Sequence, residues 1–412
     1  MYLNRQIETQ FKKIINEYSC VVLTGARQVG KSTLISINKP NDMKYVTLDD
    51  IDLLYLATTD PKYFLEFHGT PLCIDEIQKA PILLNYIKIK IDEHKLECMK
   101  NNNENELLYI LTGSQQFSMM KEVSESLAGR VGILNLFSLS QNEIHKEKRN
   151  LFIPAIEYFK QNKLNKRDTR EIFNRIFEGG MPDYIINNIS RETFFSSYLE
   201  TYINKDIRNY LNIGKSMEFY NFMQYIAVRT SCEVDYTSIS RAIGVDSNTI
   251  KKWISILESS GIIYLLQPYS SNISNRLIKR PKMYFMDTGL CTYLAKWPNS
   301  ETLEVGAMSG SIFETFIVSE IIKNYYNNGV NPKDYLFYYR DKDQYEIDLL
   351  YVDSNSITPI EIKKSISPSN PNKNFKVLNK FNLEVKQGIV LCMTEELIPF
   401  NKECLLVSVN LI

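Results

Sequence analysis

The stretch Gly25-Ala-Arg-Gln-Val-Gly-Lys-Ser32 decides the fold of the first part of this 412-residue chain. It follows an apolar run from Cys20 to Thr24, and a second apolar pattern begins at Leu34. Glycines at both ends of the loop let backbone N–H groups close around an anion, and the N-terminus of a following helix favours negative charge. The pattern therefore predicts a strand, a phosphate-binding loop and a helix, which together form a P-loop.

The residues of this P-loop have separate expected roles. The Lys31 ammonium is expected to reach the β- and γ-phosphates of ATP and to assist catalysis, and the Ser32 hydroxyl to bind Mg²⁺. The nucleotide contacts are predicted for Gly25, Ala26, Arg27, Gln28, Val29, Gly30, Lys31, Ser32 and Thr33.

A second apolar run, Leu72-Cys-Ile-Asp-Glu76, ends in two carboxylates. With a P-loop upstream, Asp75 is predicted to join the magnesium shell and Glu76 to polarise the attacking water. An adjacent water-activating carboxylate favours hydrolysis over transfer of the phosphoryl group to a metabolite. The alternative is that the acidic pair only caps the next helix.

Two further side chains are candidates for contact with the γ-phosphate. Ser114 follows the strand-like run Leu107 to Thr112, and Arg130 follows a glycine. Arginine can neutralise charge in a phosphoryl-transfer transition state, although a lone arginine is more often solvated or salt-bridged.

The composition limits the remaining possibilities. The length predicts two or three domains, and 48 basic residues balance 48 acidic ones, so any nucleic-acid contact must come from a local patch. The seven scattered cysteines, without a Cys-x-x-Cys pair, favour a reducing cytoplasm and no structural zinc. Neither a signal peptide nor an apolar run of about eighteen residues is visible, so we expect a cytoplasmic protein without a membrane span.

The order of patterns predicts a multidomain α/β protein. Strands alternate with helices at first, which indicates a parallel sheet, and a mainly helical part begins near Ser140. From Tyr236 to Tyr269, a short helix, a turn at Gly244, a second helix and a strand form a winged-helix pattern. The expected parts are an ATPase domain (1–145), a helical lid or linker (146–215), a winged helix (216–290) and a nuclease-like α/β domain (305–412).

These stretches resemble a known family, the prokaryotic AAA-type ATPases that carry a characteristic C-terminal domain of unknown function. The resemblance covers nearly the whole chain, in order, at Gly25–Thr33, Cys73–Gln78, Leu111–Gln116, Ser126–Val131, Glu178–Pro182, Tyr198–Arg208, Tyr236–Leu257, Pro281–Leu290 and Gly310–Glu314. It implies the roles given above for Lys31, Ser32, Asp75 and Glu76. It also implies that Arg130 acts near a γ-phosphate, often from a neighbouring subunit of a homo-oligomer.

Positive charge gathers in the expected winged helix. In a DNA-binding winged helix the second helix enters the major groove, so Ser247, Asn248, Lys251 and Lys252 are expected to face bases and phosphates. The segment Asn275 to Lys282 places further charge where a wing would touch the DNA backbone, at Arg276, Lys279, Arg280 and Lys282. The alternative is a packing or protein-contact module whose charges are only solvated.

The last part carries an ordered set of carboxylates. Glu314 lies in a helical pattern, Asp348 in a strand-like run, and Glu361 and Lys363 alternate on the next strand and so share a face. Two or three carboxylates that bind Mg²⁺ beside a lysine suit phosphodiester cleavage. The set is similar to the PD-(D/E)xK nuclease core, which implies catalytic roles for Asp348, Glu361 and Lys363 and a metal site at Glu314, Asp348 and Glu361.

The sequence therefore predicts an ATP- and Mg²⁺-dependent ATPase that acts on DNA. The first rival is a nucleotide-dependent switch or scaffold for a protein partner, with an inactive nuclease-like fold. The second is a small-molecule kinase, which lacks a visible substrate domain and fits poorly with the water-activating position of Glu76.

Overall fold

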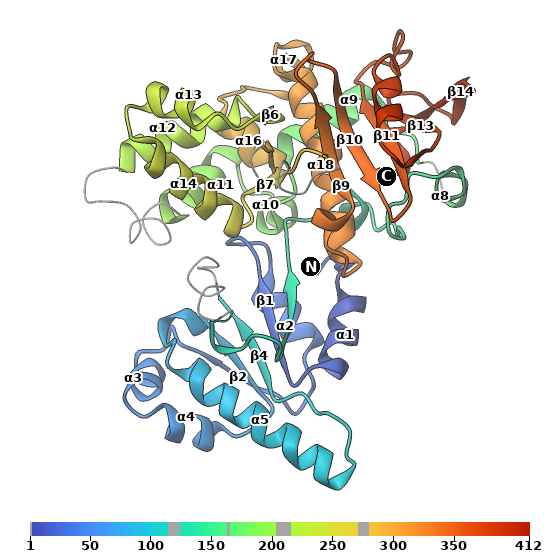
Figure 1. Cartoon of the computed structure of the whole chain (residues 1–412). Coiled ribbons are helices and arrows are strands. Elements are labelled where there is room, and N and C mark those ends of the chain that lie inside the picture. The colour runs from blue at the N-terminus through green and yellow to red at the C-terminus, as the bar shows by residue number, and fades with distance from the viewer. Residues whose placement is uncertain (1, 114–122, 124, 163–164, 203–215, 271–279) are drawn as a thin grey trace. The chain divides into compact units, whose positions relative to one another are not determined.

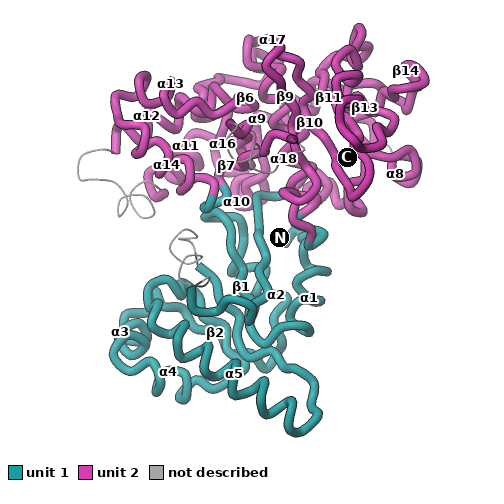
Figure 2. Tube along the Cα trace, in the orientation of Figure 1, with its two compact units in different colours: residues 1–139, 259–261, 326–329 teal, residues 140–258, 262–325, 330–412 magenta. Residues whose placement is uncertain are grey.

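The computed structural model describes residues 2–113, 123, 125–162, 165–202, 216–270 and 280–412. It divides into two compact units (Figure 1, Figure 2). Unit 1 comprises 1–139 with the short segments 259–261 and 326–329, and unit 2 comprises 140–258, 262–325 and 330–412.

The described part of unit 1 is built on a five-stranded parallel sheet in the order β2-β3-β4-β1-β5. Its strands are β1 (Cys20–Thr24), β2 (Lys44–Thr47), β3 (Leu72–Asp75), β4 (Tyr109–Thr112) and β5 (Val131–Asn135). Its helices are α1 (Glu8–Glu17), α2 (Lys31–Asn38), α3 (Ile51–Thr59), α4 (Pro61–His68) and α5 (Leu83–Asn101), with a 3-10 turn η1 (Ile77–Lys79). The predicted parallel α/β sheet is confirmed.

Alternation along β1 explains how the sheet is covered on both faces. Cys20 and Val22 belong to a core formed with β3, β4 and the helices α3, α4 and α5. The intervening residues of a strand point to the opposite face, where α1 lies against β1, β5 and α2. All five residues of β1 are consequently buried, as expected for a central parallel strand.

The first half of unit 2 is mainly helical. Its helices before the small sheet are α7 (Gln141–Ile144), α8 (Ile156–Gln161), α9 (Thr169–Glu178), α10 (Pro182–Asn187), α11 (Arg191–Tyr202) and α12 (Ser216–Ala227). They are followed by α13 (Tyr236–Ile243), α14 (Ser247–Ser259), α16 (Thr288–Leu294), α17 (Ser300–Val305) and α18 (Ser309–Asn327). Within the described residues, no helix of either unit is long and apolar enough to cross a bilayer.

A small antiparallel sheet accompanies α13 and α14, in the order β6-β8-β7. It consists of β6 (Cys232–Glu233), β7 (Ile263–Leu266) and β8 (Lys282–Phe285). The turn between the helices is at Gly244, whose φ is +80°, and Asp246 begins α14 by accepting hydrogen bonds from the N–H groups of Asn248 and Thr249. The predicted helix, turn, helix and strand are thus present in this order.

The C-terminal part holds a mixed sheet in the order β14-β15-β13-β11-β10-β9, with β12 paired to β11. Its strands are β9 (Leu336–Arg340), β10 (Glu346–Val352), β11 (Ser356–Ile362), β12 (Glu384–Val385), β13 (Gly388–Cys392), β14 (Ile398–Asn401) and β15 (Cys404–Ser408). Short 3-10 turns lie at η3 (Pro332–Asp334), η4 (Phe375–Lys380) and η5 (Val409–Leu411). The antiparallel pair β10 and β11 brings Asp348 and Glu361 onto adjacent strands.

Two stretches that carry the family resemblance lock together inside unit 2. Asp287 accepts a hydrogen bond from the Leu290 N–H at the start of α16 (2.9 Å) and another from the Gly180 N–H (2.9 Å). A Cβ on Gly179, whose φ is +75°, would lie 2.5 Å from Oδ1 of Asp287, and a Cβ on Gly289 would overlap the Glu178 carbonyl. The turn after α9 therefore needs glycine because α16 packs directly on its backbone.

Candidate functional site

The P-loop connects β1 to α2 in a backbone conformation that needs its glycines. Gly25 has a φ of +148°, and a Cβ there would overlap the carbonyl oxygen of Leu136. Gly30 precedes α2 with a φ of +92°. The loop thus curls over the carboxyl end of β1, where ligands bind in open α/β sheets. It ends at the N-terminus of α2, and the N-terminus of a helix favours an anion.

The Lys31 side chain is buried within the loop. Its ammonium donates hydrogen bonds to the carbonyl oxygens of Gly25 (2.8 Å) and Ala26 (2.7 Å). Because three donors sit on one ammonium, the group can exchange these carbonyl partners for phosphate oxygens without leaving the loop. Ser32 and Thr33 at the start of α2 are exposed, as a contact to a ligand requires.

Ser32 and Asp75 meet at the carboxyl edge of the sheet. The Ser32 hydroxyl donates to Oδ2 of Asp75 (3.3 Å), although β4 lies between β1 and β3. Hydroxyl and carboxylate oxygens are ligands that Mg²⁺ accepts, so the pair predicted for the magnesium of ATP fits that ion. Bound there, Mg²⁺ would neutralise charge on the phosphates.

Tyr45 is a site residue that the sequence did not reveal. Its hydroxyl donates to the same Oδ2 of Asp75 (2.5 Å) from the neighbouring strand β2. Burial, together with this hydrogen bond, raises the pKa of Tyr45, so the hydroxyl keeps its proton and remains a donor. The phenol therefore holds the Asp75 carboxylate in place.

Glu76 has the backbone conformation of a turn and not of a strand. Its φ is +57°, and its N–H donates to Oδ1 of Asp75 (3.0 Å). Although Glu76 precedes η1, its side chain makes no capping hydrogen bond, and the carboxylate instead accepts one from the Gln78 amide. The Glu76 residue thus lies directly after β3, and its side chain does not form the hydrogen bond that the helix-capping alternative requires.

Arg5 supports the P-loop from behind and was also missed by sequence reasoning. Its guanidinium donates to the carbonyl of Val29 in the loop (2.8 Å) and to the carbonyl of Phe137 after β5 (2.7 Å), and only 6% of the residue is exposed. Two charge-assisted hydrogen bonds to buried carbonyls fix the loop relative to the sheet. Arg5 and Phe137 are 132 positions apart in the chain, so no local sequence pattern predicts their contact.

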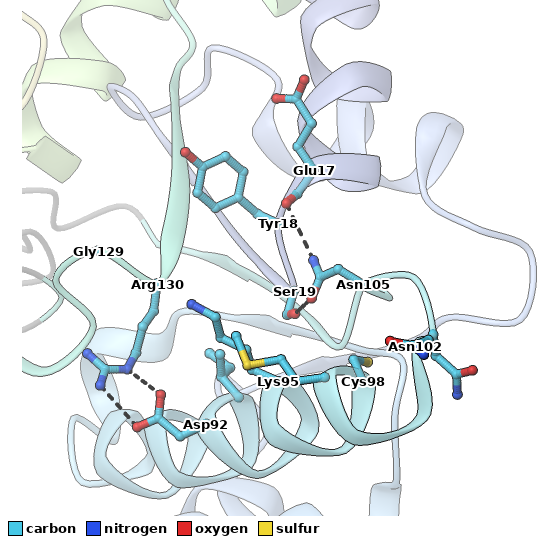
Figure 3. Close-up of a pocket in the computed structure, with 13 residues that line it drawn as sticks. Glu17, Tyr18, Ser19, Asp92, Lys95, Cys98, Asn102, Asn105, Gly129 and Arg130 are labelled. Atoms are coloured by element: carbon cyan, nitrogen blue, oxygen red, sulfur yellow. Dashed lines mark hydrogen bonds and ion pairs between the residues drawn. The ribbon is translucent and has the colours of Figure 1, made fainter.

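Arg130 lies at the opposite edge of the same sheet. It precedes β5, and the register pairs Val131 with Cys20 at the amino end of β1. Its Nε and Nη2 contact the two carboxylate oxygens of Asp92 at 2.7 and 3.0 Å (Figure 3). The five residues of β1 separate this edge from Gly25 by roughly 16 Å at about 3.3 Å per residue.

The Arg130–Asp92 pair borders an open pocket of about 790 Å³. Its polar lining includes Ser19 and Lys95, and Figure 3 shows the Ser19 hydroxyl directed to the Asn105 side chain and Lys95 rising from α5. The pocket is thus a feature of the amino edge of the sheet and is separate from the P-loop. Ser114, the other proposed γ-phosphate contact, lies outside the described residues.

One face of α14 is exposed and polar. Ile250, Trp253 and Leu257 are buried, whereas Asn248, Lys251, Lys252 and Ser255 are exposed at helical spacing. Ser247 is half-buried. The exposed face therefore carries three of the four residues that the sequence assigned to it.

The basic segment after α14 divides into different environments. Arg276 and Lys279 lie outside the described residues. Arg280 is exposed and contacts Asp235 at 2.7 Å. Lys282 is only 2% exposed, so the expectation that its charge is offered to a DNA backbone is wrong, because the side chain points into a cluster of carboxylates.

Asp348, Glu361 and Lys363 come together as the sequence predicts. The Lys363 ammonium contacts Oε1 of Glu361 at 2.7 Å and Oδ2 of Asp348 at 3.6 Å, and the Ile362 N–H donates to the same Oδ2 (2.9 Å). Asp348 and Glu361 are buried, while Lys363 is partly exposed. Oε2 of Glu361 is buried without a hydrogen-bond partner among the described residues.

Glu314 joins the cluster through two other side chains. Its Oε1 accepts a hydrogen bond from the Tyr284 hydroxyl (2.7 Å) and contacts the Lys282 ammonium at 3.2 Å. The same ammonium lies 2.5 Å from Oε1 of Glu346 and 3.9 Å from Oδ1 of Asp348. Among the residues that the structure describes, no group of three or more histidine, cysteine, aspartate or glutamate side chains is arranged to hold a metal ion.

Burial dominates the protonation of this cluster. It raises the pKa of Glu314 to about 7 and that of Glu361 to about 8, with Asp348 adding like-charge repulsion to both. Burial alone would lower the pKa of Lys282, but Tyr284 and the surrounding carboxylates raise it well above its usual value. The Lys282 ammonium therefore stays charged, and Glu314 and Glu361 hold a proton more readily than an exposed carboxyl group does.

Comparison with known families matches three consecutive parts of the chain. Residues 17–145 match an AAA domain, residues 169–301 match a domain of unknown function (DUF8612), and residues 309–412 match another (DUF4143). Together with the parallel sheet and the P-loop, the first match shows that the N-terminal part is an AAA-type P-loop ATPase domain. The last shows the expected C-terminal domain of unknown function.

Relatives and solved structures are distant. Uncharacterized proteins of Mycobacterium tuberculosis and Mycobacterium bovis are each 22% identical over 370 residues, which cover 89% of this chain and 75% of theirs. The Walker-type ATPase of Pyrococcus abyssi (PABY2304) is 14% identical with a TM-score of 0.38, covering 71% of this chain and 96% of its own. The ORC2 protein of Aeropyrum pernix is 11% identical with a TM-score of 0.35, covering 70% and 91%.

The raised pKa of Glu361 predicts a pH-dependent stability. Because its folded-state pKa of about 8 lies above the ordinary value near 4.3, its stabilising contribution is complete below the unfolded pKa and is lost as the pH rises through about 8. Relative to wild type, the free energy of unfolding of Glu361→Gln should rise from about pH 5 to about pH 8, by at most about 1.4 kcal/mol per pH unit.

Urea unfolding at several pH values measures this difference. Glu396→Gln, which neutralises an exposed carboxylate in the same unit, is the control and should follow wild type throughout. Parallel curves for Glu361→Gln and wild type would show that Glu361 is ionised in the folded protein.

Proposed function

We propose that this protein binds ATP with Mg²⁺ and hydrolyses it at the edge of the unit 1 sheet. The observation that supports this most directly is the hydrogen bond between Ser32 and Asp75, which joins the P-loop to the end of β3 across β4. Lys31 binds the phosphates, Ser32 and Asp75 hold Mg²⁺, and Tyr45 orients the Asp75 carboxylate.

Water activation falls to Glu76. Its carboxylate follows β3 directly, is partly exposed, and is held by the Gln78 amide without capping η1. A carboxylate in this place can accept a proton from water while the phosphoryl group leaves. Phosphoryl transfer to a bound metabolite would need a second substrate site in its place.

Arg130 contributes only from a second copy of the chain. Since it lies at the amino edge of the sheet and the P-loop at the carboxyl edge, its guanidinium does not reach a nucleotide bound to its own subunit. A neighbouring subunit that presents its amino edge would bring Arg130 to the γ-phosphate, where arginine stabilises transition-state charge. In the isolated chain the Arg130 guanidinium pairs with Asp92 instead of with a phosphate.

The expected target is DNA, bound through a winged helix that includes α13, α14 and the small sheet. The exposed, polar face of α14, with Asn248, Lys251 and Lys252, supports this assignment. Within the described residues neither lysine forms an ion pair with a carboxylate, and the Lys251 ammonium lies 5.8 Å from the centre of the Tyr236 ring. The rival proposal, a nucleotide-dependent scaffold, uses the same face for a protein partner.

Metal-dependent DNA cleavage by the C-terminal domain is a separate expectation from its nuclease-like resemblance. Asp348, Glu361 and Lys363 converge in support of it. The position of the Lys282 ammonium among Glu314, Glu346 and Asp348 argues against metal-dependent cleavage.

ATP hydrolysis tests the first proposal. Glu76→Gln should lower kcat by about 10²- to 10⁴-fold, the usual contribution of a general base, while ATP binding persists. Lys31→Ala should lose both binding and turnover, because it removes the cation from the phosphate loop. Phosphate release and binding of a fluorescent ATP analogue measure the two effects. Lys12→Ala, an exposed lysine of α1, is the control, and turnover in Glu76→Gln equal to wild type would defeat the assignment.

Mixing two inactive variants tests the role of Arg130. Arg130→Ala should bind ATP but lose about 10³-fold or more in turnover, and Lys31→Ala should not bind ATP but still present Arg130. If the arginine acts between subunits, the mixture should hydrolyse ATP faster than the sum of the separate variants. Absence of any recovery at concentrations where the variants co-assemble in sedimentation would reject action in trans.

Measurement of DNA binding distinguishes the proposed action on DNA from the proposed scaffold function. Lys251→Ala with Lys252→Ala should weaken binding of duplex DNA and reduce the slope of log affinity against log salt by about 1 for each lost phosphate contact. Fluorescence anisotropy across a salt series measures both. Lys12→Ala with Lys100→Ala, which removes the same charge from unit 1, should leave the slope unchanged. Wild-type protein that binds no DNA even at about 50 mM salt would favour the scaffold.

A further inference from the structure

A buried ammonium fills the carboxylate cluster of the C-terminal domain. Lys282 comes from β8 of the small sheet, not from the strands that carry Asp348 and Glu361. Its side chain is 3% exposed, and its Nζ lies 2.5 Å from Glu346, 3.2 Å from Glu314 and 3.9 Å from Asp348. The cation thus contacts three carboxylates from two elements, α18 and β10.

The surroundings hold this ammonium in one place. The Tyr338 ring lies 5.6 Å from Nζ, a distance at which a cation is attracted to an aromatic face. Tyr284, two residues along β8 and on the same face as Lys282, donates to the Glu314 oxygen that also contacts the ammonium. Backbone pairing of β8 with both β6 and β7 fixes the position from which the lysine extends.

The carboxylate oxygens that a metal would need are already used by the protein. Oδ1 of Asp348 faces Lys282, and Oδ2 accepts the Ile362 N–H and contacts Lys363. Oε1 of Glu314 is shared by Tyr284 and Lys282, and Oε1 of Glu361 contacts Lys363. A divalent ion at these oxygens would meet a fixed positive charge with the same three partners.

The unpaired Oε2 of Glu361 does not reverse this conclusion. It is buried without a hydrogen-bond partner in the described part of the chain. A single free carboxylate oxygen does not hold Mg²⁺, which takes several oxygen ligands in a near-octahedral arrangement.

We infer that the Lys282 ammonium takes the place of a metal ion at Glu314, Glu346 and Asp348, and that this cluster joins the small sheet to the C-terminal sheet instead of cutting DNA. The nuclease-like cluster is then a structural contact between the two sheets, and it does not bind a divalent metal ion. The inference concerns unit 2 alone and does not depend on ATP hydrolysis by unit 1.

Mn²⁺ binding, followed by electron paramagnetic resonance without nucleotide, tests the inference. Wild type should bind no more Mn²⁺ than Asp348→Asn. Lys282→Met, which has a similar length without the charge, should gain one site, and Lys282→Met with Asp348→Asn should lose it again. Lys282→Arg keeps a cation and should resemble wild type.

Lys323→Met is the matched control for removing a buried lysine. Lys323 is 4% exposed and contacts Glu320 at 3.0 Å. Its loss should lower stability without creating a Mn²⁺ site, because among the described residues no group of three or more possible metal ligands surrounds it.

Three results would overturn the inference. The first is Mn²⁺ binding by wild type that disappears in Asp348→Asn, and the second is Mg²⁺- or Mn²⁺-dependent DNA cleavage by wild type that disappears in the same variant. The third is a folded Lys282→Met that binds no Mn²⁺. If Lys282→Met does not fold without metal, recovery of its cooperative unfolding transition on adding Mn²⁺, but not in Lys323→Met, supports the inference, and no recovery overturns it.

Discussion

Gly25 has room for a hydrogen atom and for nothing larger. The carbonyl oxygen of Leu136 occupies the space where any other side chain would begin, so the loop after β1 closes tightly against the chain that leaves β5. Arg5 binds the loop and the segment after β5 from the other side, through Val29 and Phe137. Every later feature of the nucleotide site depends on this closure, because it places Lys31 and Ser32 at the strand edge where β3 delivers Asp75.

The sequence predicts correctly the strands and turns that depend on a local pattern of residues. The strand at Cys20–Thr24 and the turn at Gly244 have the predicted positions, and the strand-like run Leu107 to Thr112 contains β4 (Tyr109–Thr112). The residues it missed, Arg5 and Tyr45, act through contacts with distant parts of the chain. Neither has a neighbouring motif, and only the strand order β2-β3-β4-β1-β5 places Tyr45 beside Asp75.

The environment of a charged side chain is the property that is hardest to predict from the sequence. Lys251 and Lys282 both belong to basic stretches, yet the first is exposed on α14 and the second is buried among carboxylates. The difference lies in the partners that folding brings, since Glu314, Glu346 and Asp348 are more than thirty residues from Lys282. The same holds for Arg130, whose partner Asp92 lies on another element.

The contact between the turn after α9 and the start of α16 limits how this chain can change. Gly179 and Gly289 each lack space for a Cβ because the other segment's backbone or Asp287 is there. Enlarging one side has no single compensating substitution on the other, since backbone atoms cannot be made smaller. These two segments lie over a hundred residues apart in the sequence and must therefore be inherited together. A recombination event that exchanged only one of them between relatives would give a folded protein only if the donor segment had the same backbone geometry.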